Sequence, residues 1–321
     1  MRHLCSVSAA GAAALFAAAA CTNGNPPTGS SAAAPTAIVG ADLQPSVSPA
    51  VTLSPTLTST PGPSPTASLS EVLPRDKFTD PTTIDNEWFA LTPGTSLVWE
   101  GQINVDDERL GHRVIATVTN LTKVIDGIRT VVVYEQDFTP LTTRAEAELS
   151  FFAQDDDGTV WLVGEYPEEY EDGELAEAPT WLSGIKESVA GIAMMSKPEL
   201  GPSSYSEGWA PSVEFTDRAR VFETGSKTCV RTGCYADVLV IDEFNPDEPD
   251  AHQLKYYASG TGVVRVGFAG AMETTQETLG LVKVSHLTPE ALAKVDAAAL
   301  KLERHAYQVS KDVYGLTSPI E

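Results

Sequence analysis

The stretch HRVIATVTNLTKVIDGIRTVVVY, residues 112–134, decides the fold of this chain. Its first part alternates, with Val114, Ala116 and Val118 on one face, as in a half-buried β-strand. Asp126-Gly127 then separates two runs that are rich in β-branched residues, and this dipeptide is a strong signal for a two-residue hairpin turn. The stretch therefore predicts two antiparallel strands joined by a tight turn.

Short strands of the same kind recur on both sides of this hairpin. Turn residues separate them at a spacing that is typical of all-β domains. We therefore expect a mainly β fold, an antiparallel barrel, half-barrel or sandwich, and an irregular middle (179–208) of loops and a short helix. The expected strands are 95–99, 112–119, 124–125, 129–134, 145–153, 159–163, 218–222, 236–242, 255–258, 262–266 and 279–284.

A helix is expected near the C-terminus. Thr288 is a good N-cap, Pro289 suits the first helical position, and Glu290 favours the positive end of the helix dipole. Apolar residues then recur at helical spacing, which predicts a helix packed on the sheet. These residues are Leu292, Val295, Ala299, Leu302 and Ala306.

The N-terminus has the pattern of an export signal. A short basic start precedes a run of small and apolar residues, 9–20, and Cys21 follows directly. The run is shorter than the roughly 20 residues that span a bilayer. A cysteine after Ala18-Ala19-Ala20 resembles the lipobox of bacterial lipoproteins, while an ordinary secretory signal is the alternative. The resemblance implies that residues 1–20 are removed and that Cys21 carries lipid, which anchors the protein on the extracytoplasmic face of the cell membrane.

Composition divides the rest of the chain in two. Residues 21–70 consist mostly of Ala, Pro, Ser and Thr, with Asp42 as the only charged residue, so we expect a disordered tether. Residues 71–321 form the expected domain and carry the net charge of −23. This charge disfavours nucleic acid and anionic lipid surfaces as partners, because both attract basic proteins.

Cys229 and Cys234 are the two cysteines left after Cys21 and the signal peptide. Their spacing suits a disulfide across a hairpin, and an exported protein reaches an oxidising compartment. A metal knuckle would need two more soft ligands, and the nearest histidine, His252, is well removed in sequence. We therefore predict the disulfide.

The acidic turn Asp155-Asp156-Asp157-Gly158 is the candidate metal site. It does not match a calcium-binding loop, because Ala153 stands where the first acid is needed and Gly164 where the last is needed. A hairpin turn explains it better. Asp155, Asp157 and Glu165 remain the candidate calcium ligands, and Asp155 with Glu165 could form a carboxylate pair for glycoside chemistry. No motif predicts a catalytic residue or another cofactor.

Aromatic residues in the irregular middle are candidates for ligand binding. Trp181, Tyr205 and Trp209 lie there with Glu207 nearby. Such rings offer apolar area with a polar edge, which suits a carbohydrate or lipid cleft. Aromatic residues in predicted strands are instead expected in the core.

Several segments resemble a group of uncharacterised exported proteins of actinobacteria and related bacteria. The resemblance is carried by FTDP (78–81), IDN (84–86) and LTPGT (91–95), and also by the regions 153–165 and 256–264. It spans nearly all of 78–284 and implies one continuous exported domain. It assigns no activity and no catalytic residue.

Three function classes remain open at this point. The first is a membrane-anchored lipoprotein that binds a small molecule, lipid or envelope glycan in a barrel mouth or sheet concavity. The second is an extracellular hydrolase that uses paired carboxylates and is assisted by calcium. The third is a structural or protein-interaction module of the cell envelope.

Overall fold

The computed structural model describes residues 70–106, 108–248 and 250–321, which belong to one compact unit. The predicted signal peptide, Cys21 and nearly all of the tether lie outside the described residues. The elements in chain order are β1 (Thr95–Val105), β2 (Glu108–Ile125), β3 (Ile128–Phe138), β4 (Arg144–Gln154), β5 (Val160–Glu171), β6 (Glu174–Glu177), β7 (Trp181–Leu182), β8 (Val189–Met194), β9 (Tyr205–Ser206), β10 (Gly208–Trp209), the 3₁₀ turn η1 (Pro211–Val213), β11 (Arg218–Val230), β12 (Gly233–Phe244), β13 (His252–Ala258), β14 (Gly262–Ala269), β15 (Thr278–His286), the helix α1 (Pro289–Val309) and the 3₁₀ turn η2 (Tyr314–Leu316).

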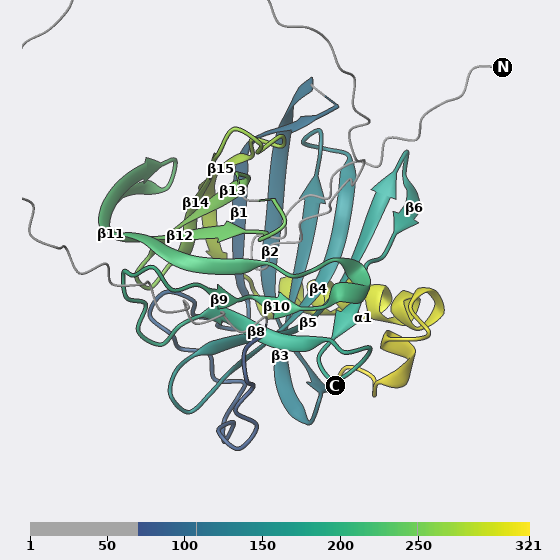
Figure 1. Ribbon diagram of the computed structural model, residues 1–321. Coiled ribbons are helices and arrows are strands. Elements are labelled where there is room, and N and C mark those ends of the chain that lie inside the picture. Colours follow the sequence, from purple (N-terminus) through teal and green to yellow (C-terminus); the bar gives the residue numbers. More distant parts are fainter. Residues whose placement is uncertain (1–69, 107, 249) are drawn as a thin grey trace, which may run out of the picture. The chain divides into compact units, whose positions relative to one another are not determined.

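One curved antiparallel sheet contains all strands of the described residues (Figure 1). Its strand order is β10-β8-β5-β4-β3-β2-β1-β15-β14-β13-β12-β11-β9. The first and last strands of this order, β10 and β9, are separated in sequence by Glu207 alone. Segment 205–209 therefore pairs with β8 on one side and with β11 on the other, and it joins the two ends of a half-barrel. The prediction of a mainly β fold with a C-terminal helix is confirmed, and of the barrel, half-barrel and sandwich that the sequence left open, the structure has a half-barrel.

The hairpin that the sequence marks most strongly forms as expected. Ile125 of β2 pairs with Ile128 of β3, and the two residues between them, Asp126 and Gly127, have φ values of 53° and 83°. Positive φ at both central positions defines the type I′ turn, which matches the twist of the flanking strands. This turn fixes the register of the adjacent pairs, from Ile125 with Ile128 to Thr122 with Val131, beyond which the register shifts.

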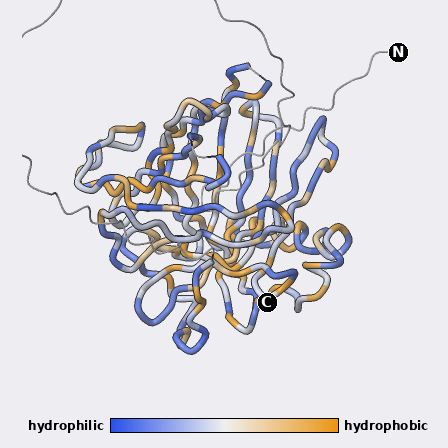
Figure 2. Tube along the Cα trace, viewed as in Figure 1, coloured by the Kyte–Doolittle hydropathy of each residue, from blue (hydrophilic) through white to orange (hydrophobic). Residues whose placement is uncertain are grey.

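The main core fills the space between the two walls of the half-barrel. Hydrophobic and hydrophilic residues follow one another along the strands, as the changes of colour along the tube in Figure 2 show. Trp99 is fully buried in this core and donates its indole N–H to the carbonyl oxygen of Val263 at 2.9 Å. The inward-facing apolar residues include Leu97, Val114, Val118, Val131, Val133, Phe152, Leu239, Ile241, Val264 and Leu281.

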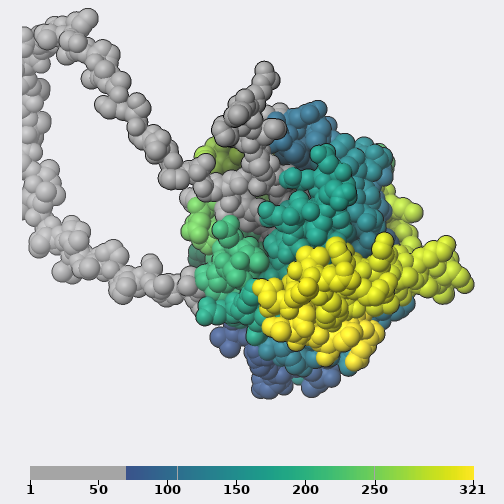
Figure 3. Space-filling view, turned by 90° about the vertical axis from the view of Figure 1, so that its right-hand side faces the viewer, coloured from purple at the N-terminus to yellow at the C-terminus, as the bar shows by residue number. Residues whose placement is uncertain are grey.

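A second core lies under α1, on the outer face of β2–β5. The hydroxyl of Thr288 accepts a hydrogen bond from the backbone N–H of Ala291, so the predicted N-cap is confirmed. Four residues of the predicted apolar stripe are buried and Val295 is half-buried. The helix and the C-terminal tail, yellow in Figure 3, cover this face, which leaves the inner face of the same strands free for the main core. No helix among the described residues is long and apolar enough to cross a membrane.

The middle of the chain differs from expectation. Region 179–208 contains the short strands β7, β8 and β9 instead of a helix. Gly191 explains part of this arrangement, because a Cβ there would lie 2.1 Å from the backbone carbon of Glu207. Such close contact of two extended segments depends on pairing between residues far apart in sequence, which local patterns do not encode.

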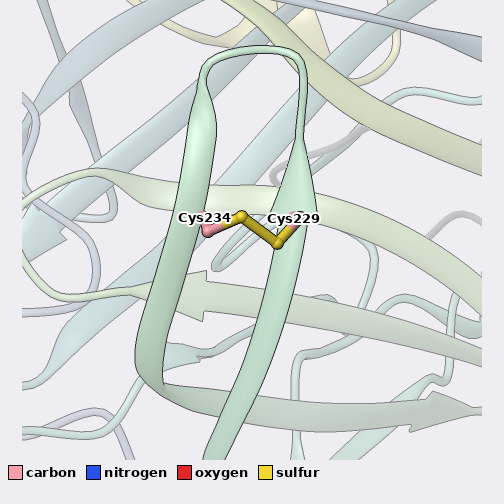
Figure 4. The surroundings of a disulfide bond; sticks show 2 residues. All are labelled: Cys229 and Cys234. Carbon is pink, nitrogen blue, oxygen red and sulfur yellow. A yellow bond between two sulfur atoms is a disulfide. The ribbon is translucent and has the colours of Figure 1, made fainter.

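Cys229 and Cys234 form the predicted disulfide (Figure 4). They stand directly opposite each other on β11 and β12, next to the turn that joins these strands. The bond closes the tip of a hairpin whose register is irregular nearer the sheet.

Candidate functional site

Strand alternation carries charged residues into the half-barrel. On β3, Val131 and Val133 face the main core, and Glu135 follows them on the same face. On the opposite wall, Leu239 and Ile241 of β12 precede Glu243 in the same way. The inner face is therefore apolar at one end of these strands and carboxylic at the other.

Five carboxyl groups and one ammonium group form what we call the carboxyl cluster: Glu135, Glu148, Glu165, Glu207, Glu243 and Lys255. Each of these residues is at most 4 % exposed. Lys255 Nζ lies 2.7 Å from Glu243 Oε2, and all five carboxyl groups interact electrostatically with Lys255. Because Glu135, Glu148 and Glu165 lie on β3–β5 and Lys255 on β13, the cluster spans the interior from wall to wall.

Glu148 and Glu165 form one half of the cluster. Glu165 Oε2 accepts the indole N–H of Trp181 at 2.7 Å, and Glu148 Oε1 accepts the hydroxyl of Ser150 at 2.9 Å. The two carboxyl groups lie within hydrogen-bonding reach of each other, so one can donate only when it is protonated. Burial raises the pKa of both, and the neighbouring charge of Glu148 raises the pKa of Glu165 further.

Glu207 and Glu243 form the other half. Burial raises the pKa of Glu207 well above its usual value, and the charge of Glu243 adds to this effect. Burial lowers the pKa of Lys255, but the charges of Glu243 and Glu207 outweigh it, so that the net change is upward. Lys255 is therefore a permanent cation at neutral pH.

Two buried carboxyl oxygens in the cluster, Glu165 Oε1 and Glu207 Oε2, accept no hydrogen bond from an N–H group of the described residues. The polar neighbours of their carboxyl groups include a second glutamate, Glu148 in one case and Glu243 in the other. A buried acceptor without a donor costs about 1–3 kcal/mol, more when it is charged. The aromatic rings of Trp181, Tyr205 and Tyr257 are buried in the same core. Free acceptors, negative charge and aromatic rings together suit a ligand that carries N–H donors and positive charge.

A separate charged group lies on the inner face beyond the cluster. His112 is fully buried, with Nε2 against Asp137 and Nδ1 2.9 Å from Glu277. Burial lowers the pKa of His112, but its hydrogen bonds to the two carboxylates raise it overall, to about 10. His112 is thus an imidazolium at neutral pH and balances part of the charge of its neighbours.

The structure brings together three of the four predicted ligand-binding residues. Glu207 is in the carboxyl cluster, Trp181 donates to it, and Tyr205 is electrostatically coupled to Glu207. Trp209 is half-buried and pairs with Val189 in the edge pair β10–β8.

The three predicted metal ligands are not brought together. Asp155 accepts hydrogen bonds from the backbone N–H groups of Asp157 and Thr159 and from the Trp161 indole, which are the bonds of a turn. Asp157 pairs with Lys77 at the surface, and Glu165 belongs to the carboxyl cluster. Within residues 70–106, 108–248 and 250–321, no group of three His, Cys, Asp or Glu side chains is arranged to hold a metal ion.

Sequence reasoning missed Glu135, Glu148, Glu243 and Lys255. A usable signal was present for two of them, because Glu135 and Glu243 continue the period-2 face of buried valines, leucines and isoleucines. Both faces of β3 are apolar, so alternation alone does not tell which face points into the half-barrel and which packs under α1.

No family model and no curated protein matches this chain. Similar solved structures include one of Bacteroides fragilis described as a "putative exported protein with YmcC-like fold", with 11 % identity, 62 % of this chain and 99 % of that chain covered, and a TM-score of 0.37. Another is a "putative lipoprotein" of Parabacteroides distasonis, with 12 % identity, coverage of 63 % and 100 %, and a TM-score of 0.33. Both scores lie below 0.5, so the fold assignment rests on the sheet topology itself, and the resemblance to actinobacterial exported proteins stays a prediction.

Proposed function

We propose that this protein is a lipid-anchored, extracytoplasmic binding protein that takes up a small organic cation inside its half-barrel. One observation carries the proposal: five buried carboxyl groups surround a single lysine, and Glu165 Oε1 and Glu207 Oε2 have no N–H donor in the part of the chain that the structure describes. A buried carboxylate without a partner is costly, so the site gains stability when an ammonium group enters.

The aromatic residues favour an organic cation. The indole of Trp181 lies against Glu165, and Tyr205 and Tyr257 are coupled to Glu207 and Glu243. An ammonium group beside an aromatic face gains about 0.5–2 kcal/mol in addition to its ion pairs. Primary amines combine the required charge and N–H donors with an apolar body.

Entry to the interior has a natural route at segment 205–209. Two residue pairs hold it to β11 and two hold it to β8, whereas β1 and β15 pair along eight residues. Glu207 lies at the centre of this segment. Local opening there requires the loss of few contacts and exposes a member of the carboxyl cluster.

The location follows from the N-terminal sequence. The lipobox-like segment that ends at Cys21 supports lipidation, and the Pro-rich tether supports a distance between the domain and the membrane. Cys21→Ala should release the protein from membranes and abolish incorporation of labelled fatty acid. Unchanged partitioning into detergent would contradict the anchor.

Native mass spectrometry is the decisive experiment for the ligand. The full chain with Cys21→Ala, purified from its own host, should retain a small cationic mass. The purified protein should also bind 1,5-diaminopentane in calorimetric titrations, and should bind choline more weakly because choline has no N–H donor. Parallel titrations use calcium chloride to test the predicted calcium site. Glu207→Gln and Glu165→Gln should abolish binding of the amine, while Glu174→Gln, on the exposed strand β6, should leave it unchanged.

Two results would overturn the proposal. One is the absence of any retained mass together with no binding of the amines. The other is amine binding that Glu207→Gln and Glu165→Gln leave unaltered, because the ligand would then bind elsewhere. Binding of calcium alone would replace the organic cation by a metal ion.

A second candidate function is hydrolysis by paired carboxylates. The adjacent carboxyl groups of Glu148 and Glu165, with raised pKa values, can share one proton and so provide an acid and a base, although they lie closer together than the roughly 5 Å or more between the carboxyl groups of glycosidases. This pair replaces the pair Asp155 and Glu165 considered from the sequence. Cleavage of chromogenic glycosides that Glu148→Gln and Glu165→Gln abolish would establish it, and absence of cleavage across such a panel would argue against it.

A further inference from the structure

Strands β14 and β15 separate after a very short pairing. They share only the pairs Arg265↔Gly280 and Val266↔Leu279. Beyond these, the carbonyl oxygen of Val263 accepts the indole N–H of Trp99 from inside the half-barrel. The sheet therefore has a seam at this point, which other parts of the chain cover.

The disulfide hairpin covers the seam. The hydroxyl of Thr232 donates to the carbonyl oxygen of Leu281 at 3.3 Å, and a Cβ on Gly280 would lie 3.3 Å from a methyl group of Val230. Cys229–Cys234 ties the two strands of the hairpin together directly beside these contacts (Figure 4). The hairpin tip is thus held against the sheet from outside.

An open groove of about 480 Å³ lies between the hairpin and the seam, and we call it the seam groove. Its volume is within the range of about 300–1,000 Å³ that is usual for small-molecule sites. Its apolar lining includes Val230, Leu279 and Val282, and Gly280 lies close to Val230 in the same lining. Arg231 and Arg265 line the same groove.

The charge of the seam groove is opposite to that of the protein as a whole. Arg265 is exposed, stacks on the ring of Tyr256 at 4.9 Å, and forms no ion pair with any carboxylate of the described residues. Glu100 is the acidic residue of the lining, and Arg113 at 2.6 Å and Arg231 at 3.6 Å neutralise it. A surplus of guanidinium groups thus lies over apolar residues on a chain with a net charge of −23.

We propose that the seam groove is a second binding site, distinct from the carboxyl cluster, for small amphiphilic carboxylates. The carboxylate pairs with Arg265, whose stacking on Tyr256 holds the guanidinium in place, and Arg231 adds a second positive charge. The short apolar body lies on Val230 and Val282. This proposal does not depend on the proposed function. The carboxyl cluster inside the half-barrel is proposed to bind a cation, whereas the seam groove is proposed to bind an anion.

Titration of the Cys21→Ala chain with octanoate, followed by NMR and calorimetry, tests the proposal. Octanoate should bind, whereas acetate, which lacks the apolar body, and octyltrimethylammonium, which reverses the charge, should not bind at the seam groove. Arg265→Gln should weaken octanoate binding about tenfold or more, since it removes a charge-assisted hydrogen bond. Arg129→Gln, an exposed arginine on β3 outside the groove, is the matched control.

Two further variants distinguish loss of the binding site from loss of the folded structure. Arg265→Lys keeps the charge and should bind octanoate more tightly than Arg265→Gln. Val282→Glu should exclude octanoate by placing a negative charge in the lining of the groove while Arg265 is intact. The proposal is overturned when octanoate does not bind, when Arg265→Gln and wild type agree within about twofold, or when acetate binds as tightly as octanoate.

Discussion

Lys255→Met is the most informative single change in this protein. Lys255 is 1 % exposed and lies 2.7 Å from Glu243, with four more carboxyl groups in electrostatic reach. At an effective dielectric constant of about 20, the Coulomb energy of that one pair is about 6 kcal/mol. Uptake of a proton by Glu243 recovers part of this energy in the variant. We therefore expect a net loss of about 3–5 kcal/mol in the free energy of unfolding at pH 7.

Denaturant unfolding followed by circular dichroism measures this loss, and thermal unfolding should fall by roughly 10 °C. The loss should shrink at pH 5, where Glu243 and Glu207 are more readily protonated. Glu243→Gln combined with Lys255→Met should restore most of the stability, because the pair is then replaced by neutral groups.

Lys186→Met with Asp312→Asn provides the matched control. This pair is exposed, and exposed ion pairs contribute little to stability, so the control should leave unfolding unchanged. The reasoning is refuted if Lys255→Met costs less than about 1 kcal/mol at pH 7, or if the double variant is no more stable than the single one.

Glu165→Gln and Glu207→Gln should each stabilise the empty protein at pH 7.5. Burial raises the pKa of both carboxyl groups above the usual value of 4.5, so the folded state binds more protons than the unfolded state, and stability falls as pH rises above that value. Thermal melts should show the gain at pH 7.5 and its decline towards pH 5; a gain equal at both pH values would contradict the linkage. Cys229→Ala with Cys234→Ala opens a short loop with a sequence separation of 5 and should cost about 2 kcal/mol in denaturant unfolding. A reduced wild type as stable as the oxidised form would contradict this. Thr288→Ala removes the N-cap of α1 and should cost about 1 kcal/mol, and an unchanged unfolding midpoint would show that tertiary packing alone holds the helix start.

Local chemistry explains what could be predicted from the sequence. Asp126-Gly127 requires two positive φ values, and Thr288-Pro289-Glu290 satisfies the first turn of a helix, so both features depend on neighbouring residues alone. The cysteine spacing in Cys229–Cys234 is equally local. The strands of the two walls follow from the same short-range patterns.

The carboxyl cluster could not be predicted in the same way. Its members come from β3, β4, β5, β12 and β13 and from Glu207, and they meet only because the sheet curves. In sequence, Glu135 and Glu243 continue the face of Val131 and Val133 and of Leu239 and Ile241, but nothing local shows that these two distant faces meet. Tyr205 and Trp181 could be singled out because aromatic residues in an irregular segment are unusual. Lys255 lies in an ordinary predicted strand, and no sequence pattern distinguishes it from a solvent-exposed lysine.

The pairing of β1 with β15 has a consequence for how the chain reaches its native state. Leu97 pairs with Val284, so the two strands at the centre of the sheet come from opposite ends of the domain. Pairing between residues so far apart in sequence slows folding. The edge of β1 that pairs with β15 has no partner until β15 has left the export channel. A chain that crosses a membrane N-terminus first would expose this edge throughout transit. We therefore expect its maturation to depend on a holding chaperone outside the cytoplasm, and truncation before β15 to produce aggregation rather than a smaller folded domain.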